Sequence, residues 1–381
     1  MSAAWMIAAR RSPVVPCGGA LAALDVDALA APVIRAVLVD AGVSSADVDE
    51  VILGNGLYGG GNPARRAALL AGLGEETPAL TLDRQCCSGL DAIALGARLI
   101  ESGSADCVLA GGVESYSRAP ERHAVDAAGA VSSTPYVRPP FTPWPDRDPE
   151  MTDAAAALAV HLGISANRQA DWAVESHVRA LAADRAGALF QELVEMPGAV
   201  RDAYMRALTP RTCMRSRRLA GAEGFEVRAA TAAVSADAAA VVCLVSQRLL
   251  SRLAPGFGCR IEGTASAGCD PALPGLAPVA ATRKLAARDG LDLETLQVFE
   301  VMEAYAAQAI ACVDALGLDP DRVNRSGGAL ARGHPIGASG AILAVRLFHE
   351  LRGEEAGARG LAAIASAGGL GTALLLQRGA P

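Results

Sequence analysis

A cysteine at the junction of a predicted strand and a predicted helix is the strongest chemical signal in the sequence. Cys86 follows a short strand predicted over residues 77–82 and precedes apolar residues at helical spacing over residues 89–100. The positive end of a helix favours a thiolate over a thiol. The alternative is an inert buried side chain, because free cysteines usually pack as small hydrophobes. The position at a helix start favours a nucleophile that is acylated on sulfur.

A histidine flanked by glycine and proline is the candidate partner of this thiol. His334 lies between Gly333 and Pro335 and precedes a second helical run. Glycine allows one backbone segment to approach another closely, so the imidazole could reach a ligand or a thiol. Cysteine beside histidine is a common arrangement for covalent catalysis, since the imidazole takes the thiol proton. The two segments together predict acyl chemistry at Cys86.

Each candidate residue begins the same series of elements. A reactive loop is followed by a helix, a strand and paired glycines, first from Cys86 to Gly111-Gly112 and again from His334 to Gly368-Gly369. The repetition predicts a duplicated α/β core that brings two equivalent loops to a shared centre. The proline-rich and charged residues between the halves predict an inserted loop domain. We expect an N-terminal half over residues 1–116, the insertion over 117–230 and a C-terminal half over 231–381.

Motifs along the whole chain are similar to those of the thiolase family. They are the opening segment from Met6 to Leu21, Gly61-Asn62-Pro63-Ala64-Arg65, Cys86-Cys87-Ser88-Gly89-Leu90, Gly111-Gly112-Val113-Glu114-Ser115, Gly163-Ile164-Ser165 and Gly333-His334-Pro335. The resemblance implies a duplicated five-layer α-β-α-β-α core with an inserted loop domain. It also implies a tight homodimer, in some members paired into a homotetramer.

The resemblance implies a mechanism in two stages. Cys86 would take an acyl group from a thioester, with His334 helping to form the thiolate. A second cysteine would then move a proton on the α-carbon of the other substrate. In the family, two oxyanion holes support these stages, and the loss of one such donor typically costs about 3–4 kcal/mol of barrier stabilisation.

The sequence departs from the family pattern where the second stage should be catalysed. Met302 replaces the Asn of the Asn-Glu-Ala-Phe motif, and Ala365 replaces the second cysteine. A thioether cannot anchor a water as an amide does, and alanine is no base. Ala367 replaces a glycine of the first oxyanion hole, beside Gly368, although its backbone N–H remains. Alanines also fill residues 154–157, where the family has polar residues. Ser366 or Cys87 remain possible substitutes for the lost thiol.

These departures leave several functions open. The leading interpretation is an acyltransferase that loads Cys86 from a coenzyme A or carrier-protein thioester and uses an acceptor other than acetyl-CoA. His334 could take a proton from an amine, alcohol or thiol, or the carbanion could arise by decarboxylation. The alternatives are an ordinary β-ketoacyl-CoA thiolase with a substitute base, a retro-aldol lyase, and a non-catalytic scaffold subunit.

Composition limits the partners and the compartment. The chain of 381 residues has a net charge of −7, which argues against general nucleic-acid binding. No apolar run is long enough to span a membrane. Nine cysteines without metal-ligand spacing fit a reducing cytoplasm, and we expect no bound metal or cofactor besides the coenzyme A thioester used as substrate. One basic cluster is either a solvated helix face or a rim that binds phosphates; it comprises Arg211, Arg215, Arg217 and Arg218.

Overall fold

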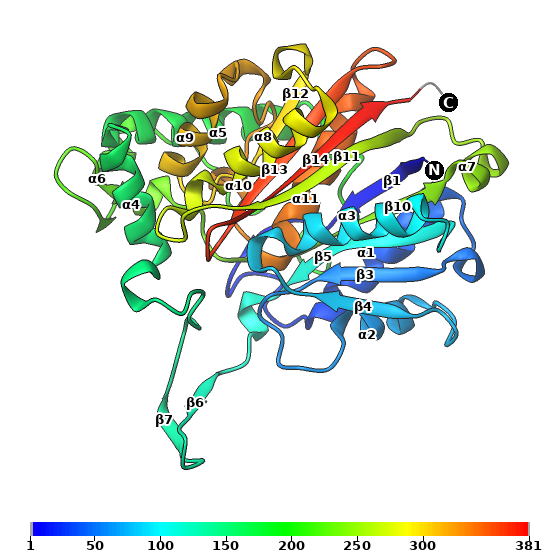
Figure 1. The fold of residues 1–381 in the computed structure, drawn as a ribbon, viewed down its shortest axis with the longest axis horizontal. Coiled ribbons are helices and arrows are strands. Elements are labelled where there is room, and N and C mark those ends of the chain that lie inside the picture. Colours follow the sequence, from blue (N-terminus) through cyan, green and yellow to red (C-terminus); the bar gives the residue numbers. More distant parts are fainter. Residues whose placement is uncertain (1–2, 380–381) are drawn as a thin grey trace.

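The computed structural model describes residues 3–379 and contains one large mixed sheet (Figure 1). Its ten strands follow the order β12-β13-β14-β11-β1-β10-β5-β3-β4, and β2 pairs with β10. The N-terminal strands are β1 (Ala4–Arg11), β2 (Val15–Pro16), β3 (Glu50–Gly54), β4 (Ala79–Leu82), β5 (Cys107–Glu114) and β10 (Ala236–Ser246). The C-terminal strands are β11 (Cys259–Gly268), β12 (Val298–Val301), β13 (Arg359–Ser366) and β14 (Leu370–Arg378).

The sheet consists of two similar groups of strands joined at the centre of the molecule. The junction is a short antiparallel pairing in which Trp5 and Met6 of β1 lie opposite Arg260 and Cys259 of β11. Each group combines parallel and antiparallel pairs, with β3 parallel to β5 in one and β12 parallel to β13 in the other. The predicted duplication therefore corresponds to two sheet halves of similar design.

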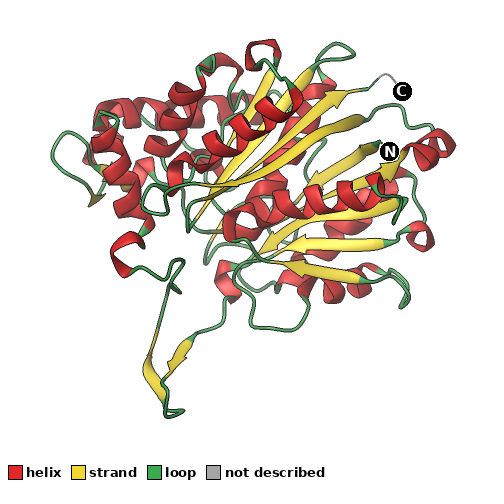
Figure 2. Ribbon diagram, in the orientation of Figure 1, coloured by secondary structure: helices red, strands yellow, loops and turns green. Residues whose placement is uncertain are grey.

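Helices cover both outer faces and fill the space between the halves (Figure 2). The helices of the two halves are α1 (Val26–Ala41), α2 (Pro63–Ala71), α3 (Ser88–Glu101), α7 (Gln247–Leu253), α8 (Ala277–Asp289), α9 (Ala306–Leu316), α10 (Ala329–Arg332) and α11 (Ile336–Arg352). One apolar cluster packs α1 and α2 on the first half, a second packs α3 and α11 between the halves, and a third packs α8 and α9 on the second half. This arrangement confirms the five-layer α-β-α-β-α core.

The two central helices follow the two reactive loops and touch at backbone distance. A Cβ added to Gly89 of α3 would lie 2.8 Å from the Gly337 carbonyl oxygen and the Ala341 nitrogen of α11. A Cβ added to Gly112 of β5 would lie 2.0 Å from the Gly337 oxygen. Glycine is required where backbones approach this closely. Several of the motif glycines therefore set the separation of the two loops that carry Cys86 and His334.

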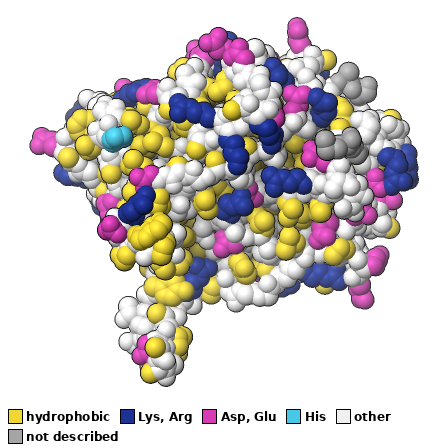
Figure 3. Space-filling view, viewed as in Figure 1, with side chains coloured by type: hydrophobic (Ala, Val, Ile, Leu, Met, Phe, Trp, Pro, Cys, Tyr) yellow, Lys and Arg dark blue, Asp and Glu magenta, His cyan; other side chains and the backbone are white. Residues whose placement is uncertain are grey.

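The region between β5 and β10 contains helices and two small hairpins. The helices are α4 (Met151–His161), α5 (Ala166–Arg185) and α6 (Pro210–Arg215), and the short strands are β6 (His123–Val125), β7 (Val131–Pro135), β8 (Arg218–Ala220) and β9 (Val227–Arg228). The β6–β7 hairpin projects from the body (Figure 3), with Val125 and Val131 exposed. β10 follows this region but pairs with β1 and β5. We propose that the C-terminal half begins after α7, because β10 belongs to the strands of the N-terminal half. The division into 1–116, 117–230 and 231–381 remains a prediction.

Candidate active site

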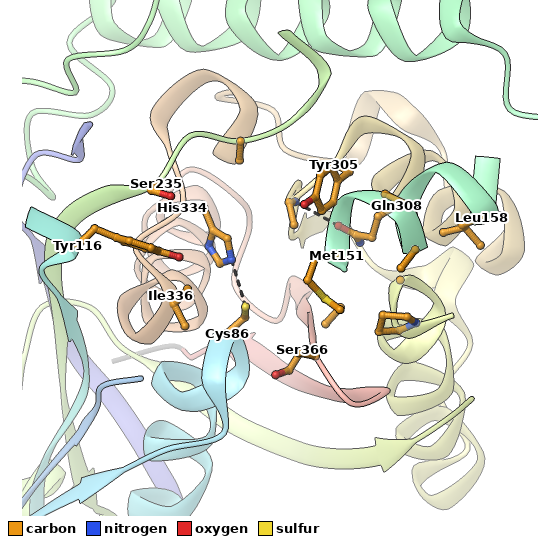
Figure 4. Close-up of a pocket in the computed structure, with 18 residues that line it drawn as sticks. Cys86, Tyr116, Met151, Leu158, Ser235, Tyr305, Gln308, His334, Ile336 and Ser366 are labelled. Atoms are coloured by element: carbon orange, nitrogen blue, oxygen red, sulfur yellow. Dashed lines mark hydrogen bonds between the residues drawn. The ribbon is translucent and has the colours of Figure 1, made fainter. Parts of the chain in front are cut away.

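The structure brings Cys86 and His334 together between the two sheet halves (Figure 4). The His334 Nε2 atom lies 3.2 Å from the Cys86 Sγ atom, although the residues are 248 positions apart in the chain. Cys86 lies in a 3₁₀ turn over Gln85–Cys87 that leads directly into α3. His334 lies between α10 and α11, and its N–H donates to the Val234 carbonyl at 2.7 Å. A thiol and a potential base are therefore in direct contact at the starts of two facing helices.

A serine in α11 fixes the orientation of the histidine ring. The His334 Nδ1 atom lies 2.7 Å from the Ser339 hydroxyl oxygen, and that hydroxyl donates to the Pro335 carbonyl at 2.9 Å. Because the hydroxyl proton is used for Pro335, its oxygen accepts a proton from Nδ1. We assign the proton of the neutral ring to Nδ1 on this basis, which leaves Nε2 as an acceptor facing the Cys86 thiol.

Burial keeps both partners uncharged in the resting site. Desolvation raises the pKa of Cys86 to about 12, and the carboxylates of Glu114 and Asp83 act in the same direction. Desolvation lowers the pKa of His334 to about 4. The helix start of α3 was expected to favour a free thiolate, but the low-polarity surroundings oppose that effect. The thiol must therefore give its proton to His334 as it attacks.

A buried carboxylate beneath the pair ties the first half of the sheet to α11. One oxygen of Glu114 accepts from the N–H groups of Gly56 and Gly337 at 2.9 and 3.0 Å. The other accepts from the Asn55 side chain at 2.6 Å. Burial raises the pKa of Glu114 to about 7 despite these donors. The bond to Gly337 holds the first turn of α11, which directly follows the His334 loop.

The reactive pair opens into a cavity of about 240 Å³ with two different walls. In Figure 4 Tyr116 and Ser235 lie on the His334 side, whereas Met151 and Leu158 lie on the opposite side. The cavity lining is made mainly of small or apolar side chains; it includes Met151, Ala154, Ala155, Leu158, Pro274, Gly275, Ala304, Ala365 and Ala367, together with the larger polar side chains of Tyr305 and Gln308. The alanines of residues 154–157 were expected to remove polar groups from the pocket, and two of them line it.

The residues predicted around the lost second cysteine lie at the end of β13. Ala365, Ser366 and Ala367 all line the cavity. The Ser366 hydroxyl donates to the Arg84 carbonyl at 3.0 Å, which argues against its use as a substitute base. Gly368 lies in the turn after β13 and is not among the lining residues.

Two other predicted positions lie away from the cavity wall. Met302 is buried in the apolar cluster between the sheet halves, and its N–H donates to the Ala363 carbonyl at 3.0 Å. Cys87, the other possible substitute thiol, is fully buried and contacts the carbonyl oxygens of Ile364 and Leu370. Burial raises its pKa well above the ordinary value. Among residues 3–379, Cys86 is the single cysteine on the cavity wall.

The predicted basic cluster is exposed beside the element that forms one wall. Arg211 and Arg215 lie in α6, and Arg217 and Arg218 lie at or just before β8. The four side chains form no ion pair within the described part of the chain. The β8–β9 hairpin packs on α4, where Val227 contacts the cluster of Ala155 and Ala156. The structure thus places positive charge next to α4, whose inner face lines the cavity.

Sequence reasoning missed three polar residues that shape the site. Tyr116 and Ser235 line the cavity beside His334, and Ser339 bonds to the histidine ring. Tyr116 directly follows the Gly-Gly-Val-Glu-Ser segment, and Ser339 falls within the conspicuous glycine-rich segment around His334. Proximity to these motifs was the available signal. No feature of the sequence marked Ser235 as a site residue, since only the tertiary structure places it beside His334.

Over residues 3–379, no cluster of three or more His, Cys, Asp or Glu side chains is arranged to hold a metal ion. Within the same range, none of the helices combines the length and apolar character needed to cross a membrane.

Comparison with known proteins gives a consistent result over the whole chain. A family model described as the thiolase N-terminal domain matches residues 4–248, and one described as the thiolase C-terminal domain matches residues 257–378. An acetyl-CoA acetyltransferase of Pseudomonas aeruginosa is 37% identical, with 98% of each chain covered. A putative acetyl-CoA C-acetyltransferase of Staphylococcus aureus is 33% identical, covering 99% of this chain and all of that protein. The crystal structure of the Bacillus anthracis acetyl-CoA acetyltransferase superimposes with a TM-score of 0.89 at 33% identity, covering 99% of both chains.

Proposed function

The chain belongs to the thiolase family, and from this premise we propose an acyltransferase that loads an acyl group on Cys86 and delivers it to an acceptor other than acetyl-CoA. The acyl donor in this proposal is a coenzyme A or carrier-protein thioester. The observation that carries the proposal is a reactive thiol–imidazole pair in a cavity whose wall has Ala365 at the position of the family's second cysteine.

The contacts of Cys86 support the loading step. As Sγ attacks the thioester carbonyl, its proton passes to Nε2 of His334 at 3.2 Å, and the imidazolium then protonates the departing thiolate of the donor. The backbone N–H groups of Cys86 and Ala367 are the proposed donors to the oxyanion. Ser339 stabilises the transient imidazolium through Nδ1.

The other side chains that line the cavity offer little for the removal of a proton from carbon. Ala365 has no ionisable group, and the Ser366 hydroxyl is held by the Arg84 carbonyl. The Tyr305 hydroxyl bonds to Thr152 at 3.0 Å, and burial raises its pKa above the ordinary value. His334 remains as the base. A proton on oxygen, nitrogen or sulfur is easier for it to remove than one on carbon.

A second candidate is the condensation or thiolysis of a β-ketoacyl-CoA. The names of the relatives favour it, since the Pseudomonas aeruginosa and Bacillus anthracis proteins are acetyl-CoA acetyltransferases. In this chain the reaction would need a base other than a second cysteine, or a carbanion formed by decarboxylation. Thiolysis of acetoacetyl-CoA by the purified protein would favour this candidate over the first.

The exposed arginines suggest how the donor is held. Arg211, Arg215, Arg217 and Arg218 are available for phosphate groups of coenzyme A or for an acidic carrier protein, because guanidinium groups pair well with phosphate. We further propose a cytoplasmic homodimer or homotetramer, as the family resemblance implies.

The test is direct observation of the loaded enzyme. The purified protein and a Cys86→Ala variant are incubated with a series of acyl-CoA thioesters, and the intact masses are compared. We expect the mass of one acyl group on the parent protein and none on the variant. A folded parent protein that gains no mass from any coenzyme A or carrier-protein thioester would refute the proposal.

A further inference from the structure

The polar side chains that line the cavity differ in whether they already form hydrogen bonds within the protein. Tyr305 bonds to Thr152, and Ser366 bonds to the Arg84 carbonyl. The Gln308 side chain accepts from the Ala304 N–H at 3.2 Å and donates to the Cys312 sulfur at 3.4 Å. Each of these groups is therefore oriented by a neighbour that does not react.

Tyr116 and Ser235 form the contrasting pair. Both line the cavity, and their hydroxyl groups lie near each other. A phenol and an aliphatic hydroxyl can each donate one hydrogen bond and accept others, so both can bond to a polar ligand in the cavity. Figure 4 shows both residues on the side of the cavity that carries His334. They are the polar groups best placed to meet a second substrate beside the imidazole.

The protein holds this pair in a defined position. Tyr116 begins a 3₁₀ turn, and the next residue, Ser117, bonds to Asp237 through both its N–H (3.0 Å) and its hydroxyl. Ser235 forms a β-bridge with His334 itself. Burial raises the pKa of Tyr116 above its ordinary value, so the phenol keeps its proton. Preorganised, protonated donors suit the recognition of a polar atom.

We propose that Tyr116 and Ser235 form the acceptor site and select an acceptor whose nucleophile is a hydroxyl or an amine. This inference rests on the proposed function, because it concerns the second half of that reaction. The acyl chain lies along the apolar wall, and the acceptor heteroatom lies between the Tyr116–Ser235 pair and Nε2 of His334. The heteroatom bonds to the acyl carbon, the bond from that carbon to Sγ breaks, and the acceptor proton passes through Nε2 to Sγ.

The experiment separates loading from discharge. Protein acylated by a coenzyme A thioester is freed of small molecules and mixed with n-butanol, n-butylamine or malonyl-CoA, and loss of the acyl mass is followed against hydrolysis in buffer. We expect the alcohol or the amine to accelerate discharge. Tyr116→Phe should lower that rate about tenfold, as expected for one lost hydrogen bond, and Ser235→Ala should lower it by a smaller factor. Loading should slow by a smaller factor than discharge, because the two hydroxyls contact the acceptor and not the acyl donor.

Tyr305→Phe is the matched comparison, since it removes a phenolic hydroxyl that bonds to Thr152 on the other wall. Equal effects of Tyr116→Phe and Tyr305→Phe on discharge would overturn the inference, as would discharge by malonyl-CoA alone or by none of the three acceptors. An effect of Tyr116→Phe on loading equal to its effect on discharge would also overturn it. Failure to load Cys86 would instead refute the proposed function, so the two outcomes are distinguishable.

Discussion

Removal of the Ser339 hydroxyl tests whether the histidine acts as the base in the orientation that the structure shows. Ser339 is buried in α11, and its oxygen lies 2.7 Å from Nδ1 of His334. Ser339→Ala deletes this acceptor and leaves the Nδ1 proton without a partner. The ring is then free to turn or to move its proton to Nε2, which faces Cys86. Ser339 is a positioning residue, because it acts on the substrate through His334.

The expected loss follows from the charge that forms on the ring. During loading His334 becomes an imidazolium, and the bond from Nδ1 to Ser339 becomes charge-assisted. Hydrogen bonds to charged groups contribute about 1.5–3 kcal/mol. Since about 1.4 kcal/mol corresponds to a tenfold change in rate, loading should slow by roughly 10- to 150-fold. Ser339→Thr keeps a hydroxyl that can donate to the Pro335 carbonyl and accept from Nδ1, and it should restore most of the rate.

The assay is single-turnover acylation of Cys86, followed by release of coenzyme A or by intact mass in quenched samples. A rate profile against pH adds a readout that a general loss of stability would not change. In the parent protein loading should fall only as the pH approaches about 4, where His334 becomes protonated. In Ser339→Ala this decrease should shift. A folded Ser339→Ala protein that loads within threefold of the parent, with the same pH profile, would refute the assigned ring orientation.

Three further predictions concern other parts of the molecule. Burial raises the pKa of Glu300 from 4.5 to about 8, so its contribution to stability is present below about pH 4.5 and is lost as the pH rises to about 8. Glu300→Gln should therefore reduce the loss of unfolding free energy between pH 6 and 8 by up to a few kcal/mol. An unchanged dependence of this free energy on pH would contradict the prediction. Replacing Arg215, Arg217 and Arg218 with glutamine should raise KM for an acyl-CoA. KM for the corresponding acyl-N-acetylcysteamine should not change, because this compound lacks the nucleotide phosphates. Equal effects on both KM values would mean that the cluster does not bind phosphate and is a solvated face. Ala365→Cys should introduce or increase acetoacetyl-CoA formation from acetyl-CoA, and no gain would mean that the absence of this thiol does not by itself limit carbon–carbon bond formation.

The sequence best predicted the positions of local strands and helices and the core implied by the family motifs. The strand predicted over residues 77–82 corresponds to β4 (Ala79–Leu82), and the helix predicted over 89–100 corresponds to α3 (Ser88–Glu101). Apolar residues at helical spacing identified α3, because one face of this helix packs in the core. The duplicated five-layer core followed from the order of motifs and is confirmed by the fold.

The protonation state of the nucleophile was less accessible from sequence. The helix start beside Cys86 suggested a thiolate, whereas the surrounding atoms raise the pKa of the thiol to about 12. A helix terminus can be identified from local spacing, but desolvation depends on the atoms that distant segments bring around the sulfur. His334, which is 248 residues away, is one of these groups.

The sequence by itself determined the reactive residue types, the glycines that allow two helices to touch, and the absence of a cysteine at position 365. Only the tertiary structure decided which side chains face one another across the cavity. It places Ser235 beside His334, seats Met302 in the apolar interior and ties Ser366 to the Arg84 carbonyl. The physical reason is that backbone preferences act over a few neighbouring residues, whereas side-chain contacts depend on how separate elements pack.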